Sequence, residues 1–550
     1  MSARAARPAP AHDVPPWSSA AVATAALALY LVLAPPVSGE GDSGEFTLAL
    51  ATGGLAHPTG YPLYTVAGHL FCRALHGLAV SWEYAANAWS AVGAALAIFF
   101  LHRLALKLAR RAAPAAPEWC HDLAALVPVV LFGLDPIWTA EATLAEVNAW
   151  HVAWALGAVT LFVAQIERLD RGGDGPDADR RAALAWGLVC GLGLAHHLTS
   201  VLVAAPLSLA LLAALARTRR LRPALAWAAV PAALVPLAAD GYVAWRAFHP
   251  ALIQWPGIGP SWHDVFDTLS GSRYHHYLGY FAPEEEHRAL LMRAGLPLLL
   301  PGLILQAVGA ARARGTVARI GVGGVLAATV AVGLFGLRYG VPDVAPYFLP
   351  AIALGALALA PALAAALGAA AAAARPLGLA LGLAMIAALG AVLAPWLRAA
   401  QSSRADLIAF ERTMRSIWAS LPPGPALVFW ADDRHSRLLE YQVLRHEKPA
   451  LIVVDPDLLA DDYPRACFTA RFGLDPLADL TLPRLTPGQA GERDAIQLLI
   501  RQMVRNINDR LALPVIFIDL SRPEVRLLDK PRPVPPARQA PPRGAFPNGA

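Results

Sequence analysis

Long apolar runs recur through most of this 550-residue chain, and they constrain its fold more than any other feature. An apolar run of about 18 or more residues is long enough to cross a bilayer as a helix. Only 15% of the residues are charged, against roughly 25% in a soluble domain. The sequence therefore predicts a polytopic α-helical membrane protein with about eleven transmembrane helices. The expected spans are 18–36, 85–102, 121–137, 147–166, 182–197, 199–216, 223–245, 290–310, 318–337, 346–367 and 376–396.

Basic residues between these spans predict how the chain is oriented. Arginine and lysine concentrate in alternate short loops, at 103–111, 168–181, 217–222 and 312–319. The positive-inside rule assigns these loops to the cytoplasm, with the N-terminus, and everything after Trp396 to the outside. This distribution accounts for the net charge of +5, so no nucleic-acid partner is predicted. An Ala-rich composition with more Arg than Lys is typical of a GC-rich bacterial genome. We expect a bacterial inner (plasma) membrane protein.

The last third of the chain has a different pattern. Short apolar runs near 425–430, 450–455 and 513–520 alternate with helical segments, which is typical of a small α/β domain. We expect four regions: a disordered cytoplasmic lead at 1–17, a transmembrane domain at 18–397, an extracytoplasmic α/β domain at 398–529 and a disordered Pro/Arg-rich tail at 530–550. The four cysteines have no metal-ligand spacing, and no disulfide is predicted.

The first outer loop carries the densest group of chemically useful side chains. Asp42 and Glu45 share one face if this stretch is helical. Two neighbouring acids followed by a histidine and two tyrosines suit general-base chemistry or cation binding. The alternative is a capped helix start, with Asp42 or Ser43 as N-cap and Glu45 bonding back. The residues that follow are His57, Tyr61 and Tyr64, and interfacial helices are expected at 42–53 and 61–77.

Further polar residues on the same predicted face are candidate donor- or acceptor-binding groups. They are Glu146, His196, His197, Arg273, Tyr274, Arg338 and Asp343. Arg338 could hold a phosphate with its guanidinium fork, or could be a snorkelling anchor. The histidine pair is expected to be functional because histidine at a membrane segment is expensive, the alternative being a boundary pair with no role. Glu146 could instead be a solvated loop acid.

Three other features leave their roles open. The aromatic residues at 255–280 form either an interfacial belt or a sugar-stacking surface. Asp432 and Asp433 follow a predicted strand, where α/β sheets often bind ligands, but a solvated turn is the simpler interpretation. No Gly-rich loop for a nucleotide is found in the cytoplasmic loops. No metal site is predicted, since adjacent histidines on a helix point in different directions.

These pieces resemble a known family, the large polytopic family related to protein O-mannosyltransferases within the GT-C class of glycosyltransferases. The most specific match is the first outer loop, in Asp42-Ser43-Gly44-Glu45-Phe46 and His57-Pro58-Thr59-Gly60-Tyr61-Pro62-Leu63-Tyr64. Weaker matches are Ala145-Glu146-Val147, His196-His197-Leu198-Thr199, the stretch from Trp262 to Tyr274, and the stretch from Asp343 to Pro350. The resemblance covers most of 18–400 and extends loosely to about 465.

The resemblance implies a GT-C fold and a polyprenyl-phosphate-linked sugar as donor, reached from the lipid bilayer. It implies that Asp42 is the catalytic carboxylate, with Glu45 as its partner, and that an extracytoplasmic hydroxyl on a protein Ser/Thr, a glycan or a lipid is the acceptor. The chain has Asp-Ser-Gly-Glu where some relatives have an Asp-Glu dipeptide, so the division of labour between the two acids is open. Arg338, His196 and His197 would stabilise the leaving phosphate, with Arg273 in reserve. No cofactor is implied; a divalent metal is compatible but not indicated.

The predicted function is therefore a hexosyltransferase, with mannose among the candidate sugars. A second hypothesis is a transporter or flippase for a lipid-linked or anionic solute, which membrane-embedded His and Arg would suit. Against it, no internal repeat is evident, and the polar residues gather at one face of the membrane. A third hypothesis is a membrane scaffold that displays the α/β domain. The sequence does not identify the sugar, the lipid, the acceptor or the oligomeric state.

Overall fold

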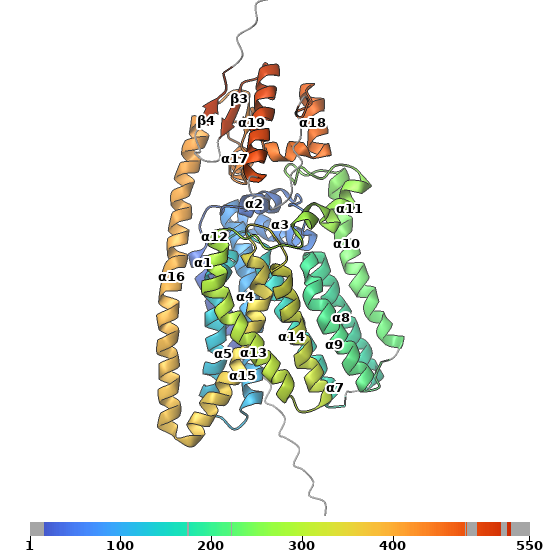
Figure 1. The fold of residues 1–550 in the computed structure, drawn as a ribbon, viewed down its shortest axis with the longest axis vertical. Coiled ribbons are helices and arrows are strands. Elements are labelled where there is room, and N and C mark those ends of the chain that lie inside the picture. Colours follow the sequence, from blue (N-terminus) through green and yellow to red (C-terminus); the bar gives the residue numbers. More distant parts are fainter. Residues whose placement is uncertain are drawn as a thin grey trace, which may run out of the picture.

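The computed structural model describes residues 16–529 apart from 173–174, 222, 479, 481–491 and 519–524. Most of the predicted lead and all of the predicted tail lie outside the described residues. The described chain is a bundle of long helices capped at one end by a small α/β unit (Figure 1). The prediction of a polytopic helical membrane protein is confirmed.

The helices of the first half run from α1 to α9. Their bounds are α1 Pro16–Leu33, α2 Ser43–Thr52, α3 Pro62–His76, α4 Trp82–Ala112, α5 Glu118–Gly133, α6 Pro136–Thr143, α7 Asn148–Asp170, α8 Pro176–His196, the short η1 Leu198–Ser200, and α9 Val201–Arg217.

The second half of the bundle runs from η2 to α16. The bounds are η2 Pro223–Ala228, α10 Ala229–Phe248, α11 Trp262–Ser270, η3 Ser272–Tyr277, α12 Glu285–Leu290, η4 Leu291–Gly295, α13 Leu296–Arg312, α14 Thr316–Gly336, η5 Ala345–Phe348, α15 Leu349–Ala373 and α16 Arg375–Ser420.

Each of the eleven predicted spans coincides with a helix. Among the described residues, nine helices are long and apolar enough to cross a membrane, or ten if α5 and α6, bent by 69°, form one span. The remaining predicted span is α8, whose first turns carry Asp177, Asp179, Arg180 and Arg181. Asp179 is buried and pairs with Arg168 of α7 and with Arg220, at 2.7 and 3.0 Å. The charges that lower the hydropathy of α8 thus fasten its end to its neighbours.

The core of the bundle lies around α15, which is apolar on all sides and buried along most of its first three turns. Close packing there depends on small residues: a Cβ at Gly302 of α13 would lie 2.3 Å from the Cα of Gly355 of α15. The bend between α5 and α6 is fixed by Tyr30, whose hydroxyl donates to the carbonyl of Gly133 at 2.9 Å and accepts from Trp138 Nε1 at 2.8 Å.

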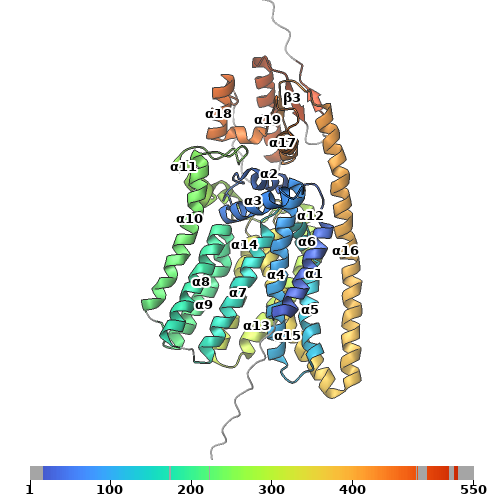
Figure 2. The ribbon, with the colours of Figure 1, turned by 180° about the vertical axis from the view of Figure 1, so that it is seen from behind.

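Two short helices, α2 and α3, lie across the end of the bundle, beneath the α/β unit (Figures 1 and 2). They agree with the predicted interfacial helices at 42–53 and 61–77. Asn87 of α4 holds the loop before them, because its amide donates to the carbonyls of Pro35 and Val37, both at 2.9 Å. The side-chain oxygen of Asn87 accepts from the amide of Ala145 at 2.9 Å. The loops near residues 35 and 145 are therefore tied to one helix end.

The α/β unit contains a four-stranded sheet with strand order β2-β1-β3-β4. Strands β1, β2 and β3 are parallel, and β4 is antiparallel to β3. The elements are β1 Ala426–Phe429, α17 His435–Leu444, β2 Leu451–Val454, η6 Pro456–Ala460, α18 Asp462–Phe472, α19 Glu492–Arg510, β3 Val515–Ile518 and β4 Val525–Leu527. The three predicted strands are β1, β2 and β3, and helices separate them as expected; β4 is a three-residue strand with no clear sequence signal.

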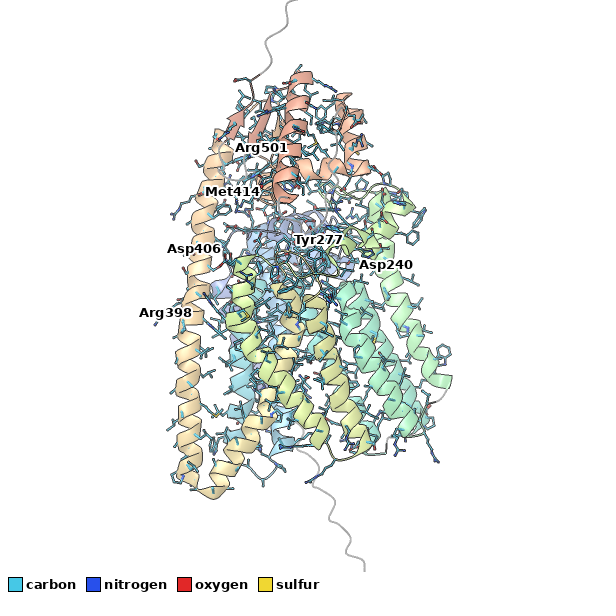
Figure 3. The ribbon with its side chains drawn as sticks, in the orientation of Figure 1. Asp240, Tyr277, Arg398, Asp406, Met414 and Arg501 are labelled. Atoms are coloured by element: carbon cyan, nitrogen blue, oxygen red, sulfur yellow. The ribbon has the colours of Figure 1, made fainter. Side chains whose placement is uncertain are left out.

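One continuous helix, α16, joins the bundle to this unit. It passes through the predicted domain boundary at residue 397 without a break, since helix-forming residues continue to Ser420. Arg398 and Asp406 are exposed along its polar half, whereas Met414 is buried against the sheet (Figure 3). The membrane segment and the α/β unit therefore share one rigid element.

Candidate active site

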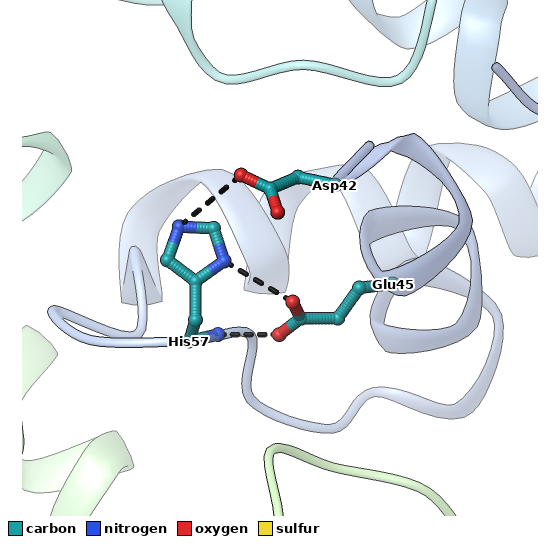
Figure 4. A group of neighbouring side chains, drawn as sticks. All are labelled: Asp42, Glu45 and His57. Atoms are coloured by element: carbon teal, nitrogen blue, oxygen red, sulfur yellow. Dashed lines mark hydrogen bonds and ion pairs between the residues drawn. The ribbon is translucent and has the colours of Figure 1, made fainter. Parts of the chain in front are cut away.

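The candidate site is built from the first residues of α2 and the loop that enters α3. Asp42 precedes α2, Glu45 lies in its first turn, and His57 reaches both acids from the following loop (Figure 4). His57 Nδ1 is 3.2 Å from Glu45 Oε2, and the His57 backbone N–H donates to Glu45 Oε1 at 2.5 Å. On the other side of the ring, His57 Nε2 is 3.8 Å from Asp42 Oδ2. The imidazole therefore lies between the two carboxylates.

The capped-helix interpretation of these acids is wrong. Asp42 occupies the N-cap position of α2 but makes no side-chain capping hydrogen bond. Glu45, which a capping box would turn back toward the helix start, instead accepts two hydrogen bonds from His57. A partner twelve residues along the chain has displaced the local capping bond.

Charge and burial act on these groups in opposite directions. Burial lowers the pKa of His57, but the charges of Asp42 and Glu45 outweigh it and raise the pKa to about 9. Enclosure by the protein raises the pKa of Asp42 to about 7, although 41% of its side-chain surface remains accessible to solvent. The positive charge of His57 lowers the pKa of Asp42, while Glu45, Asp433 and Asp343 raise it. At neutral pH the imidazole is therefore a cation, and Asp42 is close to its midpoint of titration.

Aromatic side chains surround the His57 ring. The Tyr61 hydroxyl is 3.2 Å from His57 Nε2, and Phe46 packs against the rings of His57, Tyr61 and Tyr64. Tyr61 has φ of +41°, in the left-handed region that a bulky residue rarely adopts. Pro62 then starts α3 with its fixed φ. A strained backbone conformation persists where function requires it, which supports the inference that the direction of the Tyr61 ring is functionally important.

The predicted histidine pair lies against this aromatic group. The His197 ring is 5.3 Å from that of Tyr61, and the His196 ring is 6.3 Å from that of Tyr64, measured between centroids. His197 follows directly after α8, and its Nδ1 accepts from the backbone N–H of Thr199 at 3.2 Å. Glu146 is half-buried; its backbone N–H donates to Ser90 Oγ at 3.0 Å. Burial raises the pKa of Tyr64, and the charge of Glu146 raises it further, so Glu146 lies within electrostatic range of Tyr64.

The remaining candidates come from the later outer loops. Tyr274 contacts the His57 ring, with 6.2 Å between centroids. Asp343 is exposed and close enough to Asp42 for its charge to raise the pKa of that acid. Arg273 forms an ion pair with Asp461 of the α/β unit and lies over the Trp255 ring. Arg338 is exposed and donates to the carbonyl of Gly279 at 3.3 Å. Of the two arginines, Arg338 has no acidic partner among the described residues.

Two neighbours of the site were given no firm role by the sequence. Trp255 packs its ring against His57, at 6.2 Å between centroids, so it is part of the site and not only an interfacial belt residue. Asp433, which follows β1, is close enough to Asp42 for its charge to raise the pKa of that carboxyl. The position of Asp433 after a parallel strand was the available signal, because side chains at such strand ends often face ligands.

Asp42, Glu45 and His57 each offer a ligand atom within 4.8 Å of the others, so together they could hold a metal ion. Two carboxylates and an imidazole are a donor set that divalent metals accept. A metal would, however, have to displace the proton that the two acids hold on His57, since a ligating imidazole nitrogen must be unprotonated.

Comparison with known proteins relates the chain to membrane glycosyltransferases. The chain has the fold of ArnT from Cupriavidus metallidurans, in the crystal structure bound to undecaprenyl phosphate: TM-score 0.53, 14% identity, covering 92% of this chain and 93% of that one. The apo structure of the same ArnT gives a TM-score of 0.48 with 16% identity, over 91% and 92% of the two chains. No curated protein matches. The chain is thus a multi-pass membrane protein with the fold of that ArnT structure.

Residues 42–220 match the family model described as the protein O-mannosyl-transferase TMEM260 N-terminal domain. The predicted resemblance to the protein O-mannosyltransferase-related family is confirmed. The matched segment begins at Asp42 and includes the candidate residues up to His197. Arg273, Tyr274, Arg338 and Asp343 lie beyond it.

Proposed function

We propose that this protein transfers a sugar from a polyprenyl-phosphate donor to an extracytoplasmic hydroxyl, with Asp42 as the general base. The observation that carries the proposal is the placement of Asp42 and Glu45 on either side of His57, at the end of the bundle beneath the α/β unit. A solved structure with the same fold was obtained with undecaprenyl phosphate bound, which supports a lipid-phosphate-linked donor here.

The proposed reaction is a single displacement. The Asp42 carboxylate removes the proton of the acceptor hydroxyl as its oxygen attacks the anomeric carbon. The bond from that carbon to the phosphate oxygen breaks, and its electron pair leaves with the lipid phosphate. The anomeric configuration is inverted, and the proton stays on Asp42. A base that titrates near neutral pH is well matched to this task.

Glu45 and His57 support Asp42 in this scheme. Glu45 fixes the imidazole through the ring Nδ1 and the backbone N–H of His57. The charged ring then favours the ionised form of Asp42, which would otherwise be protonated next to so many acids. Glu45 is therefore the orienting acid, and Asp42, the more exposed of the two, is the acid that meets substrate.

The leaving phosphate needs hydrogen-bond donors or a cation. We infer that Arg338 supplies the cation, because Arg273 is already paired with Asp461. His197 supplies a donor: its Nδ1 accepts from the Thr199 N–H, so a neutral His197 ring carries its proton on Nε2. His196, Tyr64, Glu146, Tyr274 and Asp343 remain candidate donor- or acceptor-binding residues.

We infer further that the N-terminus is cytoplasmic and that the α/β unit lies outside the cytoplasm, in keeping with the basic loops at the opposite end of the bundle. A bacterial inner membrane is the proposed location. The acceptor in this arrangement is a hydroxyl presented outside the cytoplasm. A protein Ser/Thr is one candidate.

The donor can be found with purified protein in proteoliposomes. A panel of radiolabelled polyprenyl-phosphate sugars, including mannose, is supplied with a mixture of protein, glycan and lipid acceptors. We expect label from one donor to enter an acceptor. If folded protein uses no donor in the panel, the enzyme proposal fails; if it moves a lipid-linked sugar across the bilayer unchanged, the protein is a flippase.

The titration of the site predicts a bell-shaped pH profile for kcat/KM. Activity should rise with pH as Asp42 loses its proton near pH 7, because only the carboxylate can act as a base. It should fall again near pH 9, because a neutral His57 ring no longer forms the ion pair that holds the Asp42 carboxylate in place. Initial rates between about pH 5.5 and pH 10 would measure both limbs. A rate that does not change through pH 7 would contradict the assignment of Asp42.

Metal removal is expected to leave transfer within about twofold of the untreated rate, because a protonated His57 repels a cation and cannot ligate it. The measurement is the initial rate after treatment with a chelator and dialysis, with added Mg²⁺, Mn²⁺ or Zn²⁺ as the comparison. A complete loss that one of these ions restores would show that Asp42, Glu45 and His57 act as metal ligands instead.

A further inference from the structure

The helix that carries the candidate base is covered by a segment almost four hundred residues further along the chain. Helix α17 of the α/β unit lies directly on α2 (Figures 1 and 2). The two helices approach closely at Gly44, where an added Cβ would lie 3.1 Å from Ser436 Cβ. Gly44 lies between Asp42 and Glu45 in sequence. The α/β unit therefore covers α2 through its helix α17.

A buried hydrogen bond between Ser38 and Glu440 joins the two segments. The Ser38 hydroxyl is 2.5 Å from Glu440 Oε1 of α17 and 3.0 Å from Thr47 Oγ1 of α2. Ser38 has one proton, and we assign it to the shorter contact, with the Glu440 carboxylate, so the contact between Ser38 and Thr47 is not a hydrogen bond. The link to α2 runs through the next residue, Gly39. Thr47 donates to the carbonyl of Ser43 at 2.8 Å, and Ser43 Oγ accepts from the backbone N–H of Gly39 at 3.0 Å. These bonds fix the residues on both sides of Asp42.

Charged partners hold Glu440 in place. Glu440 is fully buried and pairs with Arg437 at 2.5 Å, and Arg437 is only 3% exposed. Arg437 also pairs with Glu411 of α16, which accepts from the Tyr441 hydroxyl at 2.9 Å. Because a buried carboxylate is expensive without such partners, this network restricts Glu440 to one position. Ser38, and through it the start of α2, is held to the same position.

We propose that Glu440 is a positioning residue for Asp42, acting through Ser38, so that the α/β unit is a structural part of the catalytic centre. The inference rests on the proposed function for its kinetic consequence, but the contact between the two segments can be tested without it. In this arrangement the α/β unit sets the distance between the base and the reacting hydroxyl. It need not contact substrate to do so.

The test compares Ser38→Ala and Glu440→Gln with a matched control at the same interface. Arg445, the residue after α17, pairs with Glu83 of α4 at 2.9 Å, so Arg445→Gln breaks an ion pair between the same two parts without touching α2. Two quantities are measured on full-length protein in proteoliposomes: kcat and KM for the donor, and hydrogen exchange at the backbone amides of residues 43–52.

We expect Ser38→Ala and Glu440→Gln to lower kcat by about 10- to 100-fold with KM for the donor unchanged, because misplacement of a catalytic group by about 1 Å has an effect of this size. Exchange at 43–52 should rise in both variants. Ser38→Thr, which keeps the hydroxyl, should restore most of kcat. Arg445→Gln should stay within about twofold of wild type in kcat, as expected for a partly exposed pair.

Two results would overturn the proposal. One is wild-type kcat and exchange in Ser38→Ala; the other is an equal loss in Arg445→Gln, which would indicate general loosening of the interface. If Glu440→Gln does not fold, Ser38→Ala decides alone, since it removes no charge. If wild-type protein transfers no sugar, the proposed function fails, and the exchange measurement still decides whether Glu440 and Ser38 hold α2.

Discussion

Replacement of Asp42 with asparagine is expected to lower kcat/KM for sugar transfer by about 10²- to 10⁴-fold, the usual contribution of a positioned general base. The amide has the shape of the carboxylate but cannot take the proton of the acceptor hydroxyl. It also cannot form an ion pair with His57, whose Nε2 lies 3.8 Å from Asp42 Oδ2. The loss should appear in kcat, because the donor and acceptor contacts are made by other residues. Initial rates in proteoliposomes measure it.

The matched control is Glu40→Gln, two residues earlier in the same loop. Glu40 is half exposed and pairs with Arg434 at 3.3 Å. An exposed pair of this kind contributes little, so Glu40→Gln should keep activity within about twofold of wild type. Asp42→Asn with wild-type activity would remove Asp42 as the base. Equal losses in both variants would point to a general effect of charge in the loop.

Replacement of His57 with glutamine should give the second large effect. Without the positive ring the pKa of Asp42 rises, because burial and the charges of Glu45, Asp433 and Asp343 then act without opposition. At pH 7 the fraction of ionised Asp42 falls, and kcat/KM is expected to drop by about 10- to 100-fold. The acid limb of the pH profile should move to higher pH, and the alkaline limb due to His57 should disappear. Part of the activity should therefore return near pH 9.

His76→Gln serves as the control, since His76 lies in the same outer loop but stacks on Trp82 at the end of α3. It should leave both limbs of the profile where they are in wild type. If His57→Gln lowers the rate without moving the acid limb, His57 does not act through the ionisation of Asp42. A role in binding substrate would then explain the loss.

The arrangement of the fold was predictable wherever local pattern decides it. Each expected span is a helix because hydrophobic length is set by the bilayer and is read directly from the chain. Helix α8 is the one predicted span that contains several charged residues. Its Asp179 packs beside α7, and this buried charge is tolerated because Arg168 and Arg220 pair with it. The sheet order of the α/β unit depends on contacts between distant strands, which the sequence pattern does not specify.

The site was predictable in its residues and less so in its geometry. The first outer loop supplied Asp42, Glu45, His57 and Tyr61, and the structure brings all four together. The capping alternative is wrong because Glu45 accepts its hydrogen bonds from His57, which lies outside α2. Local rules describe what a side chain can do in isolation, and a tertiary partner changes the outcome.

Long-range partners were beyond prediction. Nothing in the sequence connects Ser38 with Glu440, which are separated by 402 positions, or Arg273 with Asp461, separated by 188. The second pairing matters for function, since it occupies an arginine that sequence reasoning held in reserve for the phosphate. Such pairings arise from the packing of α17 and η6 over the bundle end, and only the folded chain shows them.

The most direct test of the central claim is a balance of products from a donor labelled in both its sugar and its lipid phosphate. Wild-type protein in proteoliposomes should release one polyprenyl phosphate for each sugar joined to an acceptor, because transfer breaks the bond between the anomeric carbon and the phosphate oxygen. Asp42→Asn should release neither at a comparable rate. Movement of the intact donor between leaflets, with both labels still joined, would contradict the account and identify a transporter.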